Sequence, residues 1–355
     1  MTDAHDSMAT LDTWQNHEEL PGAEVATAAR RQSLVVAIPT YRRAQLLTEL
    51  LPSLLSQAAS VKGLGIDADV LVIDNDPQGS AADTVLDAQQ SRDVLDVGAP
   101  QLRYVLEPHP GISAARNMAL DASSQYDFLV FIDDDERPSA TWLLDLVGVQ
   151  REFRAEGVLG PVLAEYMSPP DPWIEAGGFF VRPRQKTGST REVGFTGNLL
   201  LDLHAVRGLG IRFDEEFGLS GGEDSLFTSL LTRGGGVIRW CDEAAVWDLV
   251  PTERATRRWV LTRRFRSGTS HSRVALRLEE SSATRRSLLR VSLTVGGGLR
   301  LGLGLVRWAV GMIIRSDRLQ ARGLRTSARG AGMAMGAWGY LHREYRRPPG
   351  GESST

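Results

Sequence analysis

Four short apolar runs, each followed by a pattern typical of a helix, constrain the fold of this chain more than any other feature. The expected strands are residues 33–38, 68–74, 101–107 and 126–132. The expected helices are residues 43–58, 82–90, 112–123 and 139–153, the last with Ser139 as its N-cap. Strands that are apolar throughout and alternate with helices predict an α/β fold, with a mostly parallel central sheet flanked by helices.

Polar residues follow three of these strands where each strand ends. Pro39-Thr40-Tyr41 follow the first, Asp74-Asn75-Asp76 the second, and Asp133-Asp134-Asp135 the fourth. Right-handed crossovers place the carboxyl ends of parallel strands along one edge, where open α/β sheets bind ligands. The first strand is followed by neither GxGxxG nor GxxxxGK[ST], so no dinucleotide fold or P-loop is predicted. A nucleotide held here would have to be held by carboxylates and a metal.

The aspartate triplet raises the question of what balances its charge. Carboxylates a few ångströms apart repel one another and raise each other's pKa unless a positive group lies among them. Asp133 and Asp135 form a D-x-D pair, and oxygen ligands of this kind suit Mg²⁺ or Mn²⁺. Such an ion could bridge to the diphosphate of a sugar nucleotide and neutralise it as it leaves. The alternative is an acidic turn that caps the helix beginning near Ser139.

A second acidic pair lies in the segment GGEDS. Glu223 and Asp224 follow a glycine-rich turn at the start of a helical pattern. Carboxylates at a helix N-terminus are favourable with the helix dipole, which is a purely structural explanation. A carboxylate presented there can also act as a general base on an attacking hydroxyl.

Five motifs, in order, resemble family-2 inverting glycosyltransferases of the GT-A fold, and most closely bacterial exopolysaccharide enzymes of the succinoglycan glucosyltransferase type. The resemblance covers roughly residues 33–270. The motifs are VVAIPTYRRAQLLTELLPSLLSQ, VLVIDND, GISAARNMAL, FLVFIDDDERPSATWLLDL and GLSGGEDSLF.

The resemblance implies roles for the matching residues and one inverting displacement at the anomeric carbon of a sugar. The nucleotide sugar, with a UDP-sugar expected, would be bound by Pro39, Thr40, Tyr41, Asp74, Asn75, Asp76, Arg116, Asp133 and Asp134, with Asn117 beside Arg116. Asp135 and Asp133 would hold Mn²⁺ or Mg²⁺. Asp224 would be the base, and Glu223 would help to place the acceptor.

Two departures from the family pattern stand out. Where many such enzymes have a late histidine at the metal site, EAAVWDLVP offers Asp248. Processive polymerases of the family carry [QR]xxRW, but here Ala255 precedes Arg258-Trp259 where Gln or Arg is required. This favours the addition of a single sugar over processive synthesis. His271 could meet a phosphate, and the aromatic residues of the loop at 167–192 could stack on a sugar or simply pack.

Composition bears on the compartment. The single cysteine of the 355 residues cannot form an internal disulfide, which favours a reducing compartment. The first 20 residues have neither the basic nor the apolar region of a signal peptide. We expect residues 1–32 to be a disordered acidic tail and the protein to lie in the cytoplasm, peripherally on the inner face of the cell membrane.

Charge is divided unevenly along the chain. Residues 254–355 hold 21 of the 40 Lys and Arg residues but only 5 of the 44 Asp and Glu residues. If residues 300–329 form one helix, its arginines fall on one face, opposite an apolar face that includes Leu301, Leu305 and Trp308. This pattern predicts amphipathic helices, either on an anionic membrane surface or packed on the catalytic domain. A spanning helix is disfavoured because Arg290, Arg300 and Arg307 interrupt the apolar stretch. Nucleic acid is not an expected partner, because no aromatic residues are interleaved with the arginines.

These observations predict three regions: the acidic tail, a GT-A catalytic domain over residues 33–253, and a basic helical membrane-association region over 254–355. Within the catalytic domain we expect a nucleotide-sugar half (about 33–138) and an acceptor half (about 139–253). The leading hypothesis is transfer of a sugar to a lipid-linked or polysaccharide acceptor. The alternatives are transfer to a soluble acceptor and a catalytically silent nucleotide- or carbohydrate-binding protein on the membrane. A sugar nucleotidyltransferase is disfavoured because the glycine-rich loop and lysine expected after the first strand are missing.

Overall fold

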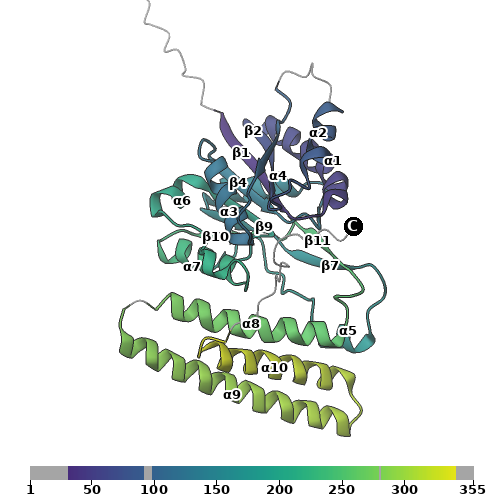
Figure 1. Ribbon diagram of the computed structural model, residues 1–355, viewed down its shortest axis with the longest axis vertical. Coiled ribbons are helices and arrows are strands. Elements are labelled where there is room, and N and C mark those ends of the chain that lie inside the picture. Colours follow the sequence, from purple (N-terminus) through teal and green to yellow (C-terminus); the bar gives the residue numbers. More distant parts are fainter. Residues whose placement is uncertain (1–30, 92–97, 280, 341–355) are drawn as a thin grey trace, which may run out of the picture. The chain divides into compact units, whose positions relative to one another are not determined.

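The computed structural model describes residues 31–91, 98–279 and 281–340 (Figure 1), so nearly all of the expected acidic tail lies outside the described residues. The strands are β1 (Gln32–Thr40), β2 (Ile66–Asp74), β3 (Leu102–Leu106), β4 (Phe128–Ile132), β5 (Glu136–Pro138), β6 (Gly157–Leu159), β7 (Val162–Tyr166), β8 (Thr190–Arg191), β9 (Asn198–Asp202), β10 (Ile238–Trp240) and β11 (Val246–Val250). The helices are α1 (Ala44–Ser60), α2 (Ala82–Gln90), α3 (Ile112–Ala122), α4 (Trp142–Phe153), α5 (Pro172–Gly177), α6 (Leu203–Leu209), α7 (Glu223–Arg233), α8 (Arg257–Arg277), α9 (Ala283–Ile313) and α10 (Asp317–Gly336), with 3₁₀ turns η1 (Val61–Leu64) and η2 (Glu215–Phe217).

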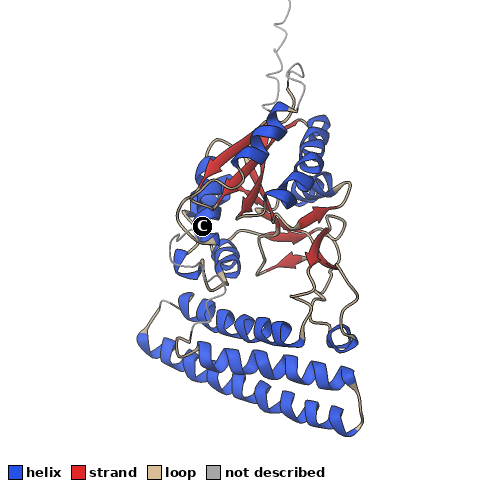
Figure 2. Ribbon diagram, turned by 45° about the vertical axis from the view of Figure 1, so that its right-hand side comes forward, coloured by secondary structure: helices blue, strands red, loops and turns tan. Residues whose placement is uncertain are grey.

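Two sheets organise the catalytic part of the chain. The larger has the order β3-β2-β1-β4-β9-β6-β10-β8, and its first four strands are parallel. β9 runs antiparallel between β4 and β6. The smaller sheet has the order β5-β11-β7. The predicted mixed α/β fold with a largely parallel central sheet is therefore confirmed (Figure 2).

Helices cover the large sheet on both faces, and β1 shows why. Leu34, Val36 and Ile38 point into a core shared with α1 and α4. Val35 and Ala37, between them in sequence, point into a second core shared with α3, α6 and α7. Because side chains alternate across a strand, a continuous apolar run is what a strand covered on both faces requires.

Two local predictions differ from the structure. Ser139 does not cap α4; the N-cap residue is Thr141. The backbone of Ser139 is held instead by a hydrogen bond from its N–H to the Ala245 carbonyl, 2.8 Å, which prolongs the pairing of β5 with β11. The segment GVLGPVLAEY, residues 157–166, predicts one further strand by its apolar run, but it divides into β6 and β7, which join different sheets. The chain turns at Gly160, where a Cβ would lie 2.0 Å from the Ala244 carbonyl oxygen.

The C-terminal region forms three long helices, with α8 between the catalytic domain and the antiparallel hairpin of α9 and α10 (Figures 1 and 2). Close packing in the hairpin depends on glycines spaced seven residues apart in α9. A Cβ at Gly304 would lie 2.6 Å from the Gly323 carbonyl oxygen, and one at Gly297 equally close to that of Gly330. Small residues at such a seam let two helix backbones approach closely.

Residues 300–329 do not form one continuous helix. α9 ends at Ile313, Arg315 takes a left-handed φ of +53°, and Ser316 caps α10 through a hydrogen bond from the N–H of Leu319. The chain reverses there, so the arginines of the two segments face each other across a hairpin instead of lying along one helix face. Of the helices in the described part of the chain, α9 passes a test of length and composition for crossing a membrane.

Candidate active site

A cavity of about 1470 Å³ lies where the carboxyl edge of the large sheet, the start of α7 and one face of α8 meet. The sequence motifs supply part of its polar lining, and the structure brings these motifs together on one cavity. The predicted residues that line it are Pro39, Thr40, Tyr41, Asn75, Arg116, Asp133, Asp134, Asp135, Glu223, Asp224 and Asp248.

Arginines offset part of the charge of the aspartate triplet. The Arg43 guanidinium donates to Asp134 at 2.6 Å and to Asp135 at 2.9 Å. The Thr40 hydroxyl, at the end of β1, donates to the other Asp134 oxygen at 2.7 Å. Arg254 lies 3.5 Å from Asp135. Asp134 is thus buried and fixed by two hydrogen-bond partners, whereas Asp133 and Asp135 are more exposed to the cavity.

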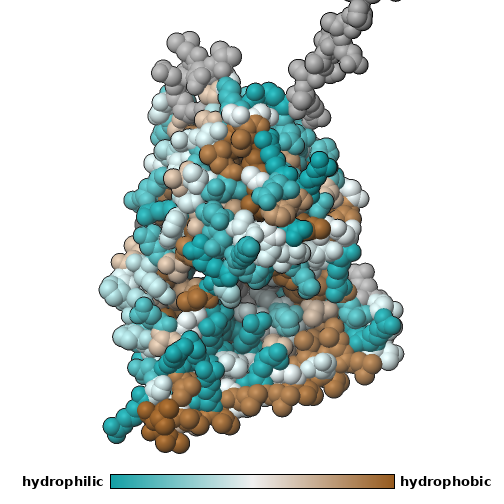
Figure 3. All heavy atoms as spheres, turned by 180° about the vertical axis from the view of Figure 1, so that it is seen from behind, coloured by the Kyte–Doolittle hydropathy of each residue, from teal (hydrophilic) through white to brown (hydrophobic). Residues whose placement is uncertain are grey.

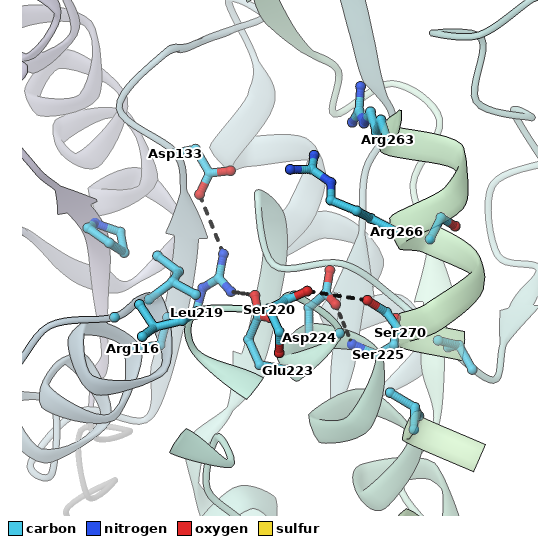
Figure 4. Close-up of a pocket in the computed structure, with 18 of the residues that line it drawn as sticks. Arg116, Asp133, Leu219, Ser220, Glu223, Asp224, Ser225, Arg263, Arg266 and Ser270 are labelled. Atoms are coloured by element: carbon cyan, nitrogen blue, oxygen red, sulfur yellow. Dashed lines mark hydrogen bonds and ion pairs between the residues drawn. The ribbon is translucent and has the colours of Figure 1, made fainter. Parts of the chain in front are cut away.

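Arg116 joins the two acidic motifs (Figure 4). Its guanidinium donates to Glu223 at 2.6 Å and lies 3.7 Å from Asp133. Both Arg116 and Glu223 are buried, and Asp133 is partly exposed. Burial, followed by the neighbouring charge of Asp224, raises the pKa of Glu223 to about 7 against the opposing effect of Arg116. The ion pair therefore connects the end of β4 to the start of α7.

Asp224 occupies the first turn of α7 beside this ion pair. Gly222 precedes the helix with φ +104°, a conformation that favours glycine, and a Cβ there would lie 3.1 Å from Ser270 of α8. One carboxylate oxygen of Asp224 accepts from the Ser225 N–H at 2.6 Å. Within the described residues, the other has no hydrogen-bond partner. Asp224 thus presents a free carboxylate oxygen at the wall of the cavity.

Of the three polar residues at the end of β2, one lines the cavity and two stabilise the loop that follows the strand. Asn75 lines the cavity and ties two loops together, donating to the His109 carbonyl at 2.7 Å and accepting from the Gly111 N–H at 3.0 Å. Asp74 is buried and accepts from the Ala81 N–H at 2.7 Å. Asp76 is held by Arg42 at 2.9 Å. Asp74 and Asp76 therefore shape the loop and are not among the residues that line the cavity.

The carboxylates suit a hard cation but do not enclose one. Among the described residues, no group of three His, Cys, Asp or Glu side chains is arranged to hold a metal ion by itself. Burial, followed by the charges of Asp135 and other acids, raises the pKa of Asp133 to about 6 even though 40% of the side chain is exposed to solvent. Burial and Asp135 also raise the pKa of Asp248. Within the described residues neither carboxylate accepts a hydrogen bond. This excess of negative charge fits a divalent ion that completes its coordination with phosphate oxygens and water.

Several residues of the site escaped sequence reasoning. The buried carboxylate of Glu136 accepts a hydrogen bond from the backbone N–H of Asp133 at 3.0 Å. Burial raises the pKa of Glu136. Arg43 lies two residues after Tyr41. Arg263 and Arg266 reach into the cavity from α8 (Figure 4). The signal was present in the run of arginines from 254 to 266, but nothing local indicated which way they would face.

The aromatic residues of the long loop mostly pack. Trp173 stacks on Phe179 with a centroid separation of 5.3 Å, and both are buried. Phe180 stacks on Trp259 of α8 at 5.8 Å, and this pair also lines the cavity. The loop therefore fixes α8 against the catalytic domain.

Comparisons with known proteins identify the family and the fold. The family model described as Glycosyl transferase family 2 matches residues 35–202. The succinoglycan biosynthesis protein ExoM of Rhizobium meliloti (strain 1021) is 40% identical over 242 residues, which cover 67% of this chain and 74% of that protein. The chain belongs to glycosyltransferase family 2. The fold of this glycosyltransferase is similar to that of S. aureus TarS 1-349, with a TM-score of 0.52 and 16% identity over 86% of this chain and 90% of that one. The predicted family and GT-A-type fold are thereby confirmed.

Proposed function

We propose that this glycosyltransferase moves a sugar from a nucleotide diphosphate sugar to a lipid-linked or polysaccharide acceptor in one inverting displacement. The observation that carries the proposal is the ion pair of Arg116 with Glu223, which also brings Arg116 to 3.7 Å from Asp133. It sets the carboxylates at the end of β4 and the start of α7 on one cavity. Sugar transfer requires this arrangement, because the donor diphosphate and the acceptor hydroxyl have to lie in the same cavity.

The chemistry assigned to Asp224 follows from its position. Its unpartnered carboxylate oxygen takes the proton of the acceptor hydroxyl as the hydroxyl oxygen bonds to the anomeric carbon. The bond from that carbon to the diphosphate oxygen breaks, and the nucleoside diphosphate leaves with the electron pair. Attack opposite the leaving group inverts the anomeric centre, so no covalent enzyme intermediate is needed.

The donor is assigned to the sheet side of the cavity. Pro39, Thr40 and Tyr41 line it beside Asn75, and they would contact the base and ribose of a UDP-sugar. Asp133, Asp135 and Asp248 would hold Mn²⁺ or Mg²⁺, which when bound would offset the charge of the departing diphosphate. Arg263 and Arg266 face the same space and would contact the diphosphate oxygens.

The acceptor and the location rest on the C-terminal helices. Eight large apolar side chains form one stripe along α9, here called the apolar stripe, and each is at least 44% exposed. They are Leu288, Val291, Val295, Leu299, Leu303, Val306, Val310 and Ile313. Figure 3 shows hydrophobic surface along this edge of the molecule. A stripe of this kind suits a helix lying in the interfacial region of a bilayer on the cytoplasmic side. Together with the relation to a succinoglycan biosynthesis protein, it supports an acceptor at the membrane in exopolysaccharide or cell-envelope synthesis.

The decisive experiment replaces the base. Asp224→Asn keeps the size of the side chain but cannot take a proton, so turnover should fall about 10²- to 10⁴-fold. Release of nucleoside diphosphate measures turnover, and calorimetry should show unchanged donor binding. Asp145→Asn is a matched control, because Asp145 occupies the first turn of α4 away from the cavity. Retained turnover in Asp224→Asn would remove Asp224 as the base.

A further inference from the structure

A second cavity, of about 520 Å³, lies between the three C-terminal helices and is lined almost entirely by arginine. Arg264 and His271 come from α8, Arg300 and Arg307 from α9, and three arginines from α10. The reversal of the chain at Arg315 brings them together. We call this the arginine cavity; its lining is Arg264, His271, Arg300, Arg307, Arg322, Arg325, Thr326, Arg329 and Met333.

The positive charge of the arginine cavity is not neutralised by the described part of the chain. None of its arginines lies within salt-bridge distance of a described carboxylate. Arg325 instead donates to the carbonyls of Gly177 and Gly178, at 3.0 and 2.8 Å. Burial, then the charges of Arg325 and other arginines, lowers the pKa of Arg264 to about 9. Crowded like charges raise the free energy of this region, and a bound polyanion would relieve it.

The composition of the cavity points to phosphate. A planar guanidinium donates two parallel hydrogen bonds to phosphate oxygens, and arginine is preferred over lysine where such recognition matters. Six arginines also exceed what a singly charged phosphodiester headgroup can offset. A diphosphate, with at least two negative charges and more acceptor oxygens, matches the cavity better.

The surroundings indicate what the diphosphate carries. His271 and Arg329 line both the arginine cavity and the catalytic cavity, so a group bound in one adjoins the other. On α9, Arg300 and Arg307 lie between the glycine seam and the apolar stripe. A diphosphate held here can therefore carry a sugar toward Asp224 and a hydrocarbon chain toward the bilayer.

We propose that the arginine cavity binds the diphosphate of a lipid-linked acceptor, which rests on the proposed transferase function and names its acceptor class. The diphosphate is not consumed: it anchors the acceptor while the sugar it carries receives the new residue. This binding requires no metal from the donor site.

The test measures binding of farnesyl diphosphate, a short lipid diphosphate, to the full chain by calorimetry in EDTA, which removes the divalent ion that the donor site requires and so leaves the arginine cavity as the binding site. The double variant Arg307→Gln/Arg322→Gln removes two charges from the cavity without touching the catalytic cavity. We expect its affinity to fall at least about tenfold. The matched control is Arg315→Gln/Arg318→Gln, which removes the same charge outside the cavity and should bind within about twofold of the unaltered chain.

Other probes identify the source of the phosphate. Equal affinity for inorganic pyrophosphate would overturn the lipid assignment. Equally tight, variant-sensitive binding to phosphatidylglycerol vesicles would overturn the diphosphate assignment in favour of bulk lipid headgroups. Because substitution relieves charge repulsion, the double variant should keep or raise the thermal midpoint, so a loss of binding would not reflect unfolding. Nucleoside diphosphate release that depends on Asp224 while farnesyl diphosphate fails to bind would sink this inference and leave the transferase function standing.

Discussion

Membrane binding through the apolar stripe can be tested with two substitutions whose effect the structure allows us to estimate. Leu299 and Leu303 lie one turn apart on α9 and are 63% and 69% exposed. Replacing both with glutamine keeps a good helix former and adds no charge. The seam with α10 should be undisturbed, because the stripe lies on the opposite side of α9 from Gly297 and Gly304.

The magnitude follows from the exposed fractions. Burying a whole leucine side chain contributes about 1.5–3 kcal/mol, so the exposed parts of these two should contribute about 2–4 kcal/mol together when the stripe enters a bilayer. At about 1.4 kcal/mol for each factor of ten, vesicle partitioning should weaken about 30- to 700-fold. Anionic lipid headgroups would attract the basic helices of the unaltered chain and of the variant equally, so this attraction should not change the ratio.

The assay is sedimentation with vesicles containing phosphatidylglycerol, at several lipid concentrations. Leu86→Gln is the control, because Leu86 is a 49% exposed leucine on α2 of the catalytic domain. Its partitioning should equal that of the unaltered chain. If Leu299→Gln/Leu303→Gln sediments as strongly as the control, the stripe is not inserted, and the membrane assignment of α9 fails.

Three further predictions concern the site and the hairpin. UDP should bind only with Mn²⁺ or Mg²⁺, and Asp133→Asn should weaken that binding. Loss of an outer-shell partner costs a metal site about 10- to 100-fold in affinity, so loss of a direct ligand should cost at least as much. Calorimetry with and without EDTA measures the binding, and equal binding in EDTA would contradict the metal site. The raised pKa of Glu223, about 7 against an ordinary 4.5, means that the folded chain holds a proton that the unfolded chain has released between these values; this contribution to stability falls as pH rises through that window, so Glu223→Gln should flatten the dependence of the thermal midpoint on pH, and parallel curves for the two proteins would refute it. Gly304→Ala should destabilise the hairpin by about 1–3 kcal/mol through contacts with α10, whereas Gly302→Ala, where a Cβ would meet nothing within 4 Å, should stabilise it by about 0.5–1 kcal/mol; shifts of the same sign in thermal denaturation would contradict the close-packed seam.

Much of the catalytic fold could be predicted because its signals are local. The expected helix at 82–90 matches α2, and the apolar runs near 33–38 and 68–74 fall inside β1 and β2. The end of the strand before Asp133 and the glycine turn before Glu223 can likewise be predicted from neighbouring residues. The misplaced helix cap at Ser139 shows the limit: pairing with Ala245, more than a hundred residues away, overrode the local preference.

The assembly of the site depended on contacts between distant residues. Arg43 reaches Asp134 across 91 positions of sequence, and Arg116 reaches Glu223 across 107. Local pattern carries no information about which of many arginines closes such a pair, or that Asp74 and Asp76 are occupied in supporting a loop. These choices are made when the sheet and α7 pack together.

The C-terminal region shows the same division most clearly. Its sequence alone determined that the last hundred residues are basic, helical and apolar in stretches, since charge and helical spacing are properties of the chain itself. Only the tertiary structure decided that the chain reverses at Arg315, so that arginines expected on one helix face converge from three helices on one cavity. The physical reason is the glycine seam: without side chains to hold α9 and α10 apart, backbone contact between the helices outweighs the repulsion of the charges that it gathers.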